Sequence, residues 1–143
     1  MKDAFLRLAV LSENTVGTSR GIVGEWGLSI YIEVNGMKIL FDTGESGGLL
    51  NNSDVMGIDL KSVEALVLIH GHYDHTGGMK SFLRCRGKLP VYAHPGLFAC
   101  HYGTPEKPRY IGVPQKKSAG KPWSGICIYE RTSRDIARCV CQW

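Results

Sequence analysis

The six residues 70–75, with the sequence HGHYDH, constrain this chain more than any other segment. They follow the apolar run 65–69, which has the length of one buried strand and places the motif at a strand end. The motif holds three of the chain's five histidines and a carboxylate, as His70, His72, Asp74 and His75. Such neutral nitrogen and anionic oxygen donors suit zinc, iron or manganese. The sequence therefore predicts a metal site in the loop that leaves a buried strand.

The spacing of these four residues predicts two adjacent divalent ions. Side chains two apart in an extended backbone point the same way, so His70 and His72 can face one ion. Asp74 and His75 are neighbours, and they must curl into a turn to hold a second ion beside the first. Glycines on either side of the motif make such a turn sterically easy. The alternative is a solvated polar turn that binds nothing, but the predicted strand and helix around the motif favour metal binding.

The apolar pattern predicts an α/β fold with a mixed sheet. Strands are expected at 5–11, 28–34, 37–41, 64–69 and 90–93, and helices at 49–56 and 79–84. The pair Asn35-Gly36 indicates a tight hairpin, and Thr76 is the expected N-cap of the second helix. Strand, helix and strand in that order predict a right-handed parallel crossover, which places helices on one face of the sheet.

Two motifs together resemble the metallo-β-lactamase fold superfamily. Residues 70–75 match its H-x-H-x-D-H signature, and Phe41-Asp42-Thr43-Gly44 resembles its Asp motif at a strand end. With the segments 12–15 and 25–29, they resemble the prokaryotic group that contains dihydropterin-methyl-ribofuranosylaminobenzene-phosphate synthase of methanopterin biosynthesis. Many members of that group are known only as metal-dependent hydrolases. The resemblance implies the N-terminal half of an αβ/βα sandwich.

The resemblance also implies an activity. It suggests a dinuclear metal-dependent hydrolase, or a related transferase, acting on a phosphorylated or pterin-like small molecule. The two ions would be zinc, or manganese or iron, and they would activate water at neutral pH. In this reading His70, His72, Asp74 and His75 are ligands rather than acid–base catalysts. In synthase-like relatives the ions would hold the diphosphate leaving group of the pterin substrate.

Three further residues are candidates for the site or its surroundings. Two of them have two interpretations each. Asp42 either ends its strand in an Asx-type turn or, as in the family, supports the metal loop by hydrogen bonds, and both can hold together. His94 follows the next strand of the crossover at the same carboxyl edge as His70, so it is a candidate substrate contact. It is equally a histidine hydrogen-bonded at a strand end. His101 is expected to be a surface residue.

The family resemblance covers about residues 4–114 and then stops. Family domains are longer and build their site from two similar halves, whose second half adds two histidines and a bridging Asp. After His75 this chain has only His94 and His101, and no Asp until Asp135. We therefore expect a partial domain at 1–114 and a divergent tail at 115–143. The alternative function is a catalytically inactive fragment that binds metal weakly at most.

The charge distribution marks the same boundary. Residues 1–114 contain 11 Lys+Arg and 11 Asp+Glu, whereas 115–143 contain 6 and 2, together with three of the five cysteines. A shift this abrupt is what a frameshifted or truncated gene would produce. A missing half would also leave one sheet face without its covering layer, which predicts self-association or binding of a complementing chain.

Several partner classes find no support in the sequence. The N-terminal apolar run is interrupted by charges and predicts a strand rather than a signal peptide, and no stretch is long enough to cross a bilayer. Basic residues are scattered and do not alternate with aromatic ones, which argues against nucleic-acid binding. Five cysteines without a Cys-x-x-Cys pair indicate reduced thiols and a cytoplasmic protein.

Overall fold

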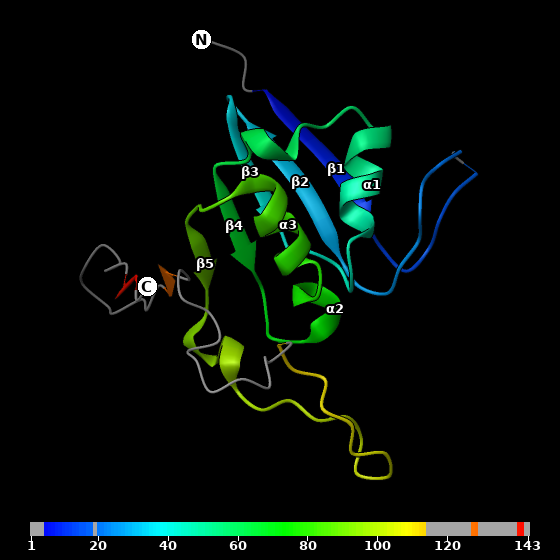
Figure 1. Cartoon of the computed structure of the whole chain (residues 1–143), viewed down its shortest axis with the longest axis vertical. Coiled ribbons are helices and arrows are strands. Elements are labelled where there is room, and N and C mark those ends of the chain that lie inside the picture. Colours follow the sequence, from blue (N-terminus) through cyan, green and yellow to red (C-terminus); the bar gives the residue numbers. More distant parts are fainter. Residues whose placement is uncertain (1–4, 19, 114–126, 129–139, 142–143) are drawn as a thin grey trace.

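The computed structural model describes residues 5–18, 20–113, 127–128 and 140–141 (Figure 1). Its main feature is a five-stranded sheet in which strand order equals chain order. The strands are β1 Leu6–Ser12, β2 Ser29–Val34, β3 Met37–Phe41, β4 Ala65–Leu68 and β5 Val91–Ala93. β1, β2 and β3 pair antiparallel, whereas β3, β4 and β5 pair parallel. The predicted mixed α/β sheet is confirmed.

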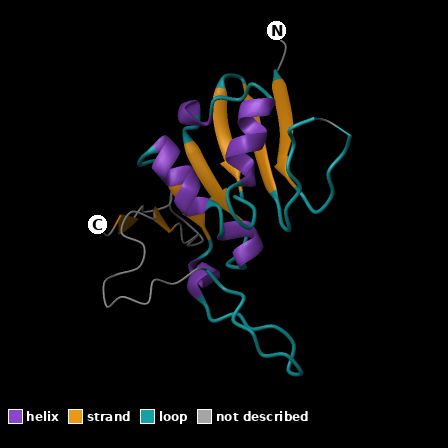
Figure 2. Ribbon diagram, turned by 45° about the vertical axis from the view of Figure 1, so that its right-hand side comes forward, coloured by secondary structure: helices purple, strands orange, loops and turns teal. Residues whose placement is uncertain are grey.

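Short helices connect these strands. They are α1 Gly48–Val55, the 3₁₀ helix η1 Leu60–Ser62, α2 Tyr73–Thr76, α3 Met79–Arg86 and the 3₁₀ helix η2 Pro95–Phe98. Figure 2 shows α1 and α3 lying across the same face of the sheet. Further along the chain, β6 Cys127–Ile128 pairs antiparallel with β7 Val140–Cys141. The remainder of the predicted tail at 115–143 lies outside the described residues.

The β2–β3 hairpin turns where the sequence predicted it. Val34 pairs with Met37, so Asn35 and Gly36 are the central turn residues. Their φ angles are +50° and +89°, which is the left-handed conformation that a two-residue type I′ turn requires. This turn fixes the register of β2 and β3, and with it the position of the residues that follow Phe41.

The core lies between the sheet and the helices. Alternate strand residues point to the helix side and are almost fully buried, and apolar residues of α1 and α3 cover them. The central members are Leu11, Tyr31, Leu40, Leu66 and Val91 from the five strands, and Leu49, Met79 and Phe82 from the helices. Each strand of the sheet is therefore anchored to one core, which holds the carboxyl ends of β3, β4 and β5 in place.

The opposite face of the sheet is apolar but exposed at its β1 edge. Leu6, Leu8 and Val10 alternate with the buried residues of β1 and are 60%, 61% and 51% exposed. On neighbouring strands Val34 and Met37 are also exposed. Exposed apolar residues that lie side by side on one sheet face form a surface suited to association.

The expected N-cap at Thr76 is wrong. Thr76 ends the short helix α2, and its hydroxyl donates a hydrogen bond of 2.9 Å to the carbonyl of His72. The next helix, α3, begins at Met79 with Gly78 as its N-cap. Residues 73–76 thus form a helical turn of their own, which separates residues 70–72 from α3. Within the described ranges, each helix is too short or too polar to cross a bilayer.

Candidate metal centre

The four motif residues lie in the loop that follows β4 and in the short helix α2. His72 caps α2 with extended backbone angles, and Asp74 and His75 lie within that single helical turn. The ligand atoms of His70, Asp74 and His75 all lie within 4.8 Å of one another, whereas His72, which was expected to pair with His70, is not in this group. All three side chains are half-buried, so they combine limited solvent contact with access from outside. This convergence is the physical basis for a metal site.

Asp42 holds His75 in position. The Asp42 carboxylate is fully buried, and its Oδ2 lies 2.7 Å from Nδ1 of His75. Its Oδ1 accepts a hydrogen bond of 3.0 Å from the amide of Ile69, which links it to the end of β4. Asp42 itself has a φ of +55°, so it also ends β3 in a left-handed turn. A carboxylate that bonds one ring nitrogen of a histidine leaves the other nitrogen available as a ligand.

The geometry of the donor atoms fits a metal ion. Nε2 of His75 lies 3.6 Å from Oδ2 of Asp74, which is too long for a hydrogen bond. Two donors on one tetrahedral zinc, with bonds of about 2.0–2.1 Å, lie roughly 3.4 Å apart. The ring of His70 is close to both neighbouring histidines, with centroid distances of 4.1 Å to His75 and 4.5 Å to His72. The residues present therefore fit a divalent transition metal.

Burial and neighbouring groups shift the pKa values of two side chains at the site, His70 and Asp42. Burial lowers the pKa of the His70 imidazole, and the nearby rings of His75 and His72 lower it further. The neutral form that a metal requires is thus favoured at His70. Burial raises the pKa of the Asp42 carboxyl, while the hydrogen bonds from His75 and from the Ile69 amide oppose that shift. These two hydrogen bonds therefore favour the ionised form of Asp42, against the effect of burial.

The glycines around the motif serve close packing rather than unusual backbone angles. Gly77 has an ordinary helical φ of −65°, yet a Cβ there would collide with the carbonyl oxygen of Glu45. A Cβ at Gly71 would collide with the carbonyl oxygen of Leu97 in η2. The sequence suggested that these glycines ease a turn, but the structure shows that they let neighbouring backbones touch the loop. The loop is therefore held on both sides.

Gly77→Ala is expected to lower the free energy of unfolding by about 1–3 kcal/mol, because overpacking forces the backbone apart. Backbone atoms surround the new methyl group, so no flexible side chain can move aside. Urea denaturation measures the change. Gly17→Ala is the matched control, since a Cβ at Gly17 meets nothing within 4 Å. Equal stability of the Gly77→Ala variant and the wild type would contradict this packing.

Glu25 and Gly27 join a second loop to the site, and sequence reasoning gave them no role. The Glu25 carboxylate accepts hydrogen bonds from the hydroxyls of Ser46 and Ser12, at 2.5 Å and 3.3 Å. Gly27 packs directly against the carbonyl of Asp74, and its amide donates a hydrogen bond of 2.7 Å to Asn14. The signal in the sequence was the E-W-G-L-S segment, but only the fold shows that it packs against α2.

The two remaining histidines have different surroundings. His94 is exposed, and its Nδ1 accepts a hydrogen bond of 3.0 Å from the amide of Gly96, which caps η2. It lies outside the group of convergent ligand atoms, and its role as a substrate contact stays a prediction. His101, which was expected to be a surface residue, is half-buried, and its Nε2 atom is buried. Its ring lies 4.9 Å from the ring of His72, because the backbone after η2 turns back toward the metal loop.

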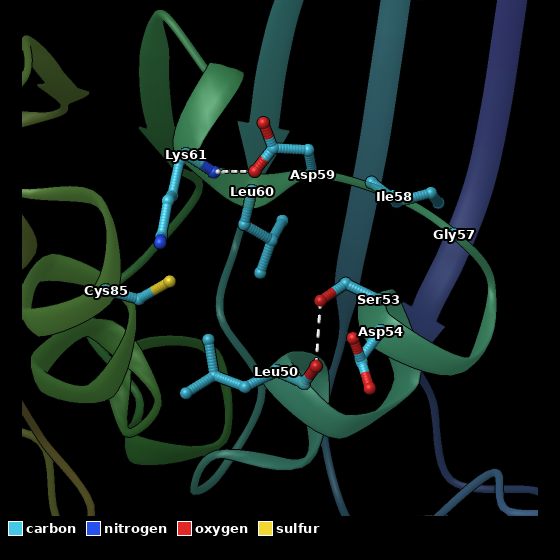
Figure 3. Close-up of a pocket in the computed structure, with 9 residues that line it drawn as sticks. All are labelled: Leu50, Ser53, Asp54, Gly57, Ile58, Asp59, Leu60, Lys61 and Cys85. Carbon is cyan, nitrogen blue, oxygen red and sulfur yellow. Dashed lines mark hydrogen bonds between the residues drawn. The ribbon is translucent and has the colours of Figure 1, made fainter.

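The structure also has a hollow of about 460 Å³ between α1, η1 and α3 (Figure 3). Two polar groups that line it make hydrogen bonds within the chain. The Ser53 hydroxyl donates to the Leu50 carbonyl, and the Asp59 carboxylate accepts from the Lys61 amide. The motif residues do not line it. The hollow is therefore separate from the candidate metal centre.

Fold and site together define a class of protein. A profile described as "Beta-lactamase superfamily domain" matches residues 37–106, which include both motifs. The Rm3 metallo-β-lactamase has a similar fold, with a TM-score of 0.53 at 20% sequence identity, over 76% of this chain and 41% of that one. The chain belongs to the metallo-β-lactamase superfamily.

Two curated relatives show how far this likeness reaches. The 7,8-dihydropterin-6-methyl-4-(beta-D-ribofuranosyl)-aminobenzene-5'-phosphate synthase of Methanocaldococcus jannaschii is 35% identical over 105 residues, which are 69% of this chain and 36% of that protein. Ribonuclease J 1 of Streptococcus pyogenes is 35% identical over 111 residues, 68% of this chain and 19% of that protein. The chain thus spans well under half the length of these relatives, whose named activities differ. The likeness establishes the superfamily and leaves the substrate open.

Proposed function

We propose that this chain binds two divalent metal ions through His70, His72, Asp74 and His75. We further propose that it belongs to a metal-dependent hydrolase or transferase that acts on a phosphorylated small molecule. The observation that carries the proposal is the contact of 2.7 Å between Asp42 and Nδ1 of His75, which directs Nε2 of His75 toward Asp74. Zinc suits these nitrogen and oxygen donors, as do manganese and iron.

The chain's own residues would prepare the site in three ways. Asp42 holds the proton on Nδ1 of His75 and so fixes the tautomer whose Nε2 is free. Burial favours the neutral, ligating form of His70. The packed glycines fix the loop against Glu45 and Leu97, so the donors need no large rearrangement. When bound, divalent ions supply a hydroxide nucleophile near neutral pH and polarise the oxygen of the scissile bond.

The substrate class rests on two weaker supports. The synthase from Methanocaldococcus jannaschii carries a 5'-phosphate and a dihydropterin in its name. In this chain Trp26 is 58% exposed and directly precedes Gly27, which packs against the backbone of Asp74. An exposed aromatic ring beside a metal loop suits a planar ring such as a pterin. We also propose a cytoplasmic location, which the free thiols of Cys85 and Cys100 support.

His72→Ala is expected to lower zinc affinity at least about tenfold, because the loss of a ligand should cost no less than the loss of an outer-shell partner. Competition with a chromogenic chelator measures the affinity, and elemental analysis measures the metal retained per chain. His94→Ala is the matched control, since it removes an exposed histidine that lies outside the motif at residues 70–75. Equal zinc affinity in the His72→Ala variant and the wild type would refute the site.

The alternative function is an inactive fragment that binds metal weakly at most. The observation in its favour is the short coverage of the relatives, 36% of the synthase and 19% of the ribonuclease. Catalytic zinc usually has three protein ligands, whereas the motif offers two for each of two ions. Hydrolysis of a chromogenic phosphodiester by the zinc-loaded chain separates the two functions. Turnover that disappears in the His72→Ala variant supports the hydrolase, and metal binding without turnover supports the fragment.

A further inference from the structure

The segment 101–111 forms an arm whose base is joined to the metal loop. The amide of Ile111 donates a hydrogen bond of 2.9 Å to the carbonyl of His101, which closes the base. The carbonyl of Ile111 in turn accepts a hydrogen bond of 2.9 Å from the amide of Tyr73, the residue after His72. Farther out, Tyr102 and Tyr110 pair as an antiparallel bridge. Two consecutive backbone hydrogen bonds therefore tie His101 to the motif.

This connection places the His101 ring inside the cluster of motif histidines. Its ring stands nearly perpendicular to that of His72, at 86° and 4.9 Å between centroids. A Cβ built at Gly71 would lie 3.1 Å from Nε2 of His101, so this nitrogen faces the backbone of the metal loop. His101 thus contacts His72, whereas the ligand atoms that converge with those of His70 belong to Asp74 and His75.

Nε2 of His101 is buried and has no hydrogen-bond partner among the described residues. A buried polar atom without a partner costs about 1–3 kcal/mol, so native structures usually satisfy such atoms. A positively charged ligand would satisfy it, because neutral imidazole nitrogen is a preferred donor for zinc and similar metals. The ring that carries this nitrogen lies beside the ring of His72, a residue with that chemistry.

We propose that His101 is a metal ligand, which adds its Nε2 to those of His70 and His72. This inference rests on the proposed metal site at residues 70–75 and extends it. It raises the nitrogen donors on the His72 side of the cluster from two to three, the number that catalytic zinc usually takes from the protein. The arm then serves to deliver a ligand, and its docking on Tyr73 sets the position of that ligand.

The test measures metal affinity and the cobalt absorption spectrum of His101→Phe in the full chain. Phenylalanine keeps an aromatic ring against His72 but has no donor atom. We expect zinc affinity to fall at least about tenfold, as for His72→Ala, and the visible d–d bands of bound Co²⁺ to shift because one ligand is replaced. His94→Phe is the control for adding phenylalanine and should leave zinc affinity and the Co²⁺ spectrum unchanged.

The two proposals fail in different ways. If His72→Ala and His101→Phe both bind zinc like the wild type, the metal site itself is wrong. If His72→Ala weakens zinc binding while His101→Phe leaves the affinity and the Co²⁺ spectrum unchanged, only the role of His101 is overturned. Circular dichroism checks that each variant is folded, and His101→Gln provides a second variant should the phenylalanine disturb packing. Weaker zinc binding with a shifted spectrum in a folded variant supports the ligand.

Discussion

Asp42→Ala is expected to lower the free energy of unfolding by about 4–7 kcal/mol. The substitution removes two hydrogen bonds to a buried carboxylate, each worth about 1.5–3 kcal/mol when the acceptor is charged. It also leaves the amide of Ile69 and Nδ1 of His75 without their acceptor. Alanine at a φ of +55° adds roughly 1 kcal/mol of backbone strain. Because domains of this size have about 5–15 kcal/mol in total, the loss should be visible in urea denaturation.

Two companion variants separate these contributions. Asp42→Gly removes the hydrogen bonds but tolerates the left-handed backbone, so the difference between Asp42→Ala and Asp42→Gly isolates the strain. Asp42→Asn keeps the shape and one acceptor for Ile69, and it tolerates the same φ. We expect Asp42→Asn to recover much of the stability while zinc affinity still falls about 10- to 100-fold, because the amide does not hold the proton on Nδ1 of His75 as a carboxylate does. Zinc affinity at the wild-type level in Asp42→Asn would contradict the positioning role.

The second large effect concerns self-association through the open sheet face. In purified solution another copy of the chain can cover this face, so we expect the wild type to sediment as a dimer or larger species. Leu8 and Val10 are 61% and 51% exposed and lie on that face. Burying two such side chains is worth roughly 3–6 kcal/mol. The double variant Leu8→Glu/Val10→Glu should therefore weaken association more than about 100-fold.

The matched control for this experiment lies on the other side of the molecule. Val55 is 48% exposed in α1, on the helix-covered side, so Val55→Glu adds a charge without touching the open face. We expect it to sediment like the wild type. A wild-type chain that stays monomeric over the whole range of concentrations would show that the exposed face does not drive association. Dissociation caused equally by Val55→Glu would indicate a general effect of charge.

The sequence predicted the sheet well because local signals and burial agree there. The strand at 37–41 and the turn at Asn35-Gly36 follow from alternation and from turn chemistry, and the structure confirms both. The sequence did not predict that Gly77 lies against the Glu45 carbonyl, since this contact joins two loops through the fold. The same holds for His101, whose local sequence His-Tyr-Gly gave no indication that its ring lies beside His72. Its position depends on the return of the chain at Ile111.

The prediction that Thr76 begins the second helix was wrong for a related physical reason. A threonine before an apolar helix is a common N-cap, and nothing local to Thr76 argues otherwise. In the structure its hydroxyl is used inside the turn formed by residues 73–76, because that turn packs between the backbones of Glu45 and Leu97. Tertiary contacts at the metal loop therefore overrode a local preference. Such departures are expected where residues serve a site rather than an element.

The agreement between strand order and chain order bears on how the protein is made. Each strand docks beside the strand synthesised just before it, so the sheet can grow from its first hairpin as the polypeptide leaves the ribosome. Asp42, residues 70–75 and His101 leave the ribosome in that order. Stepwise growth of this kind keeps loop closures short and favours rapid folding. The loop would thus be shaped in two stages, first against Asp42 and Glu45, which precede it, and then by Leu97 and Ile111, which follow it.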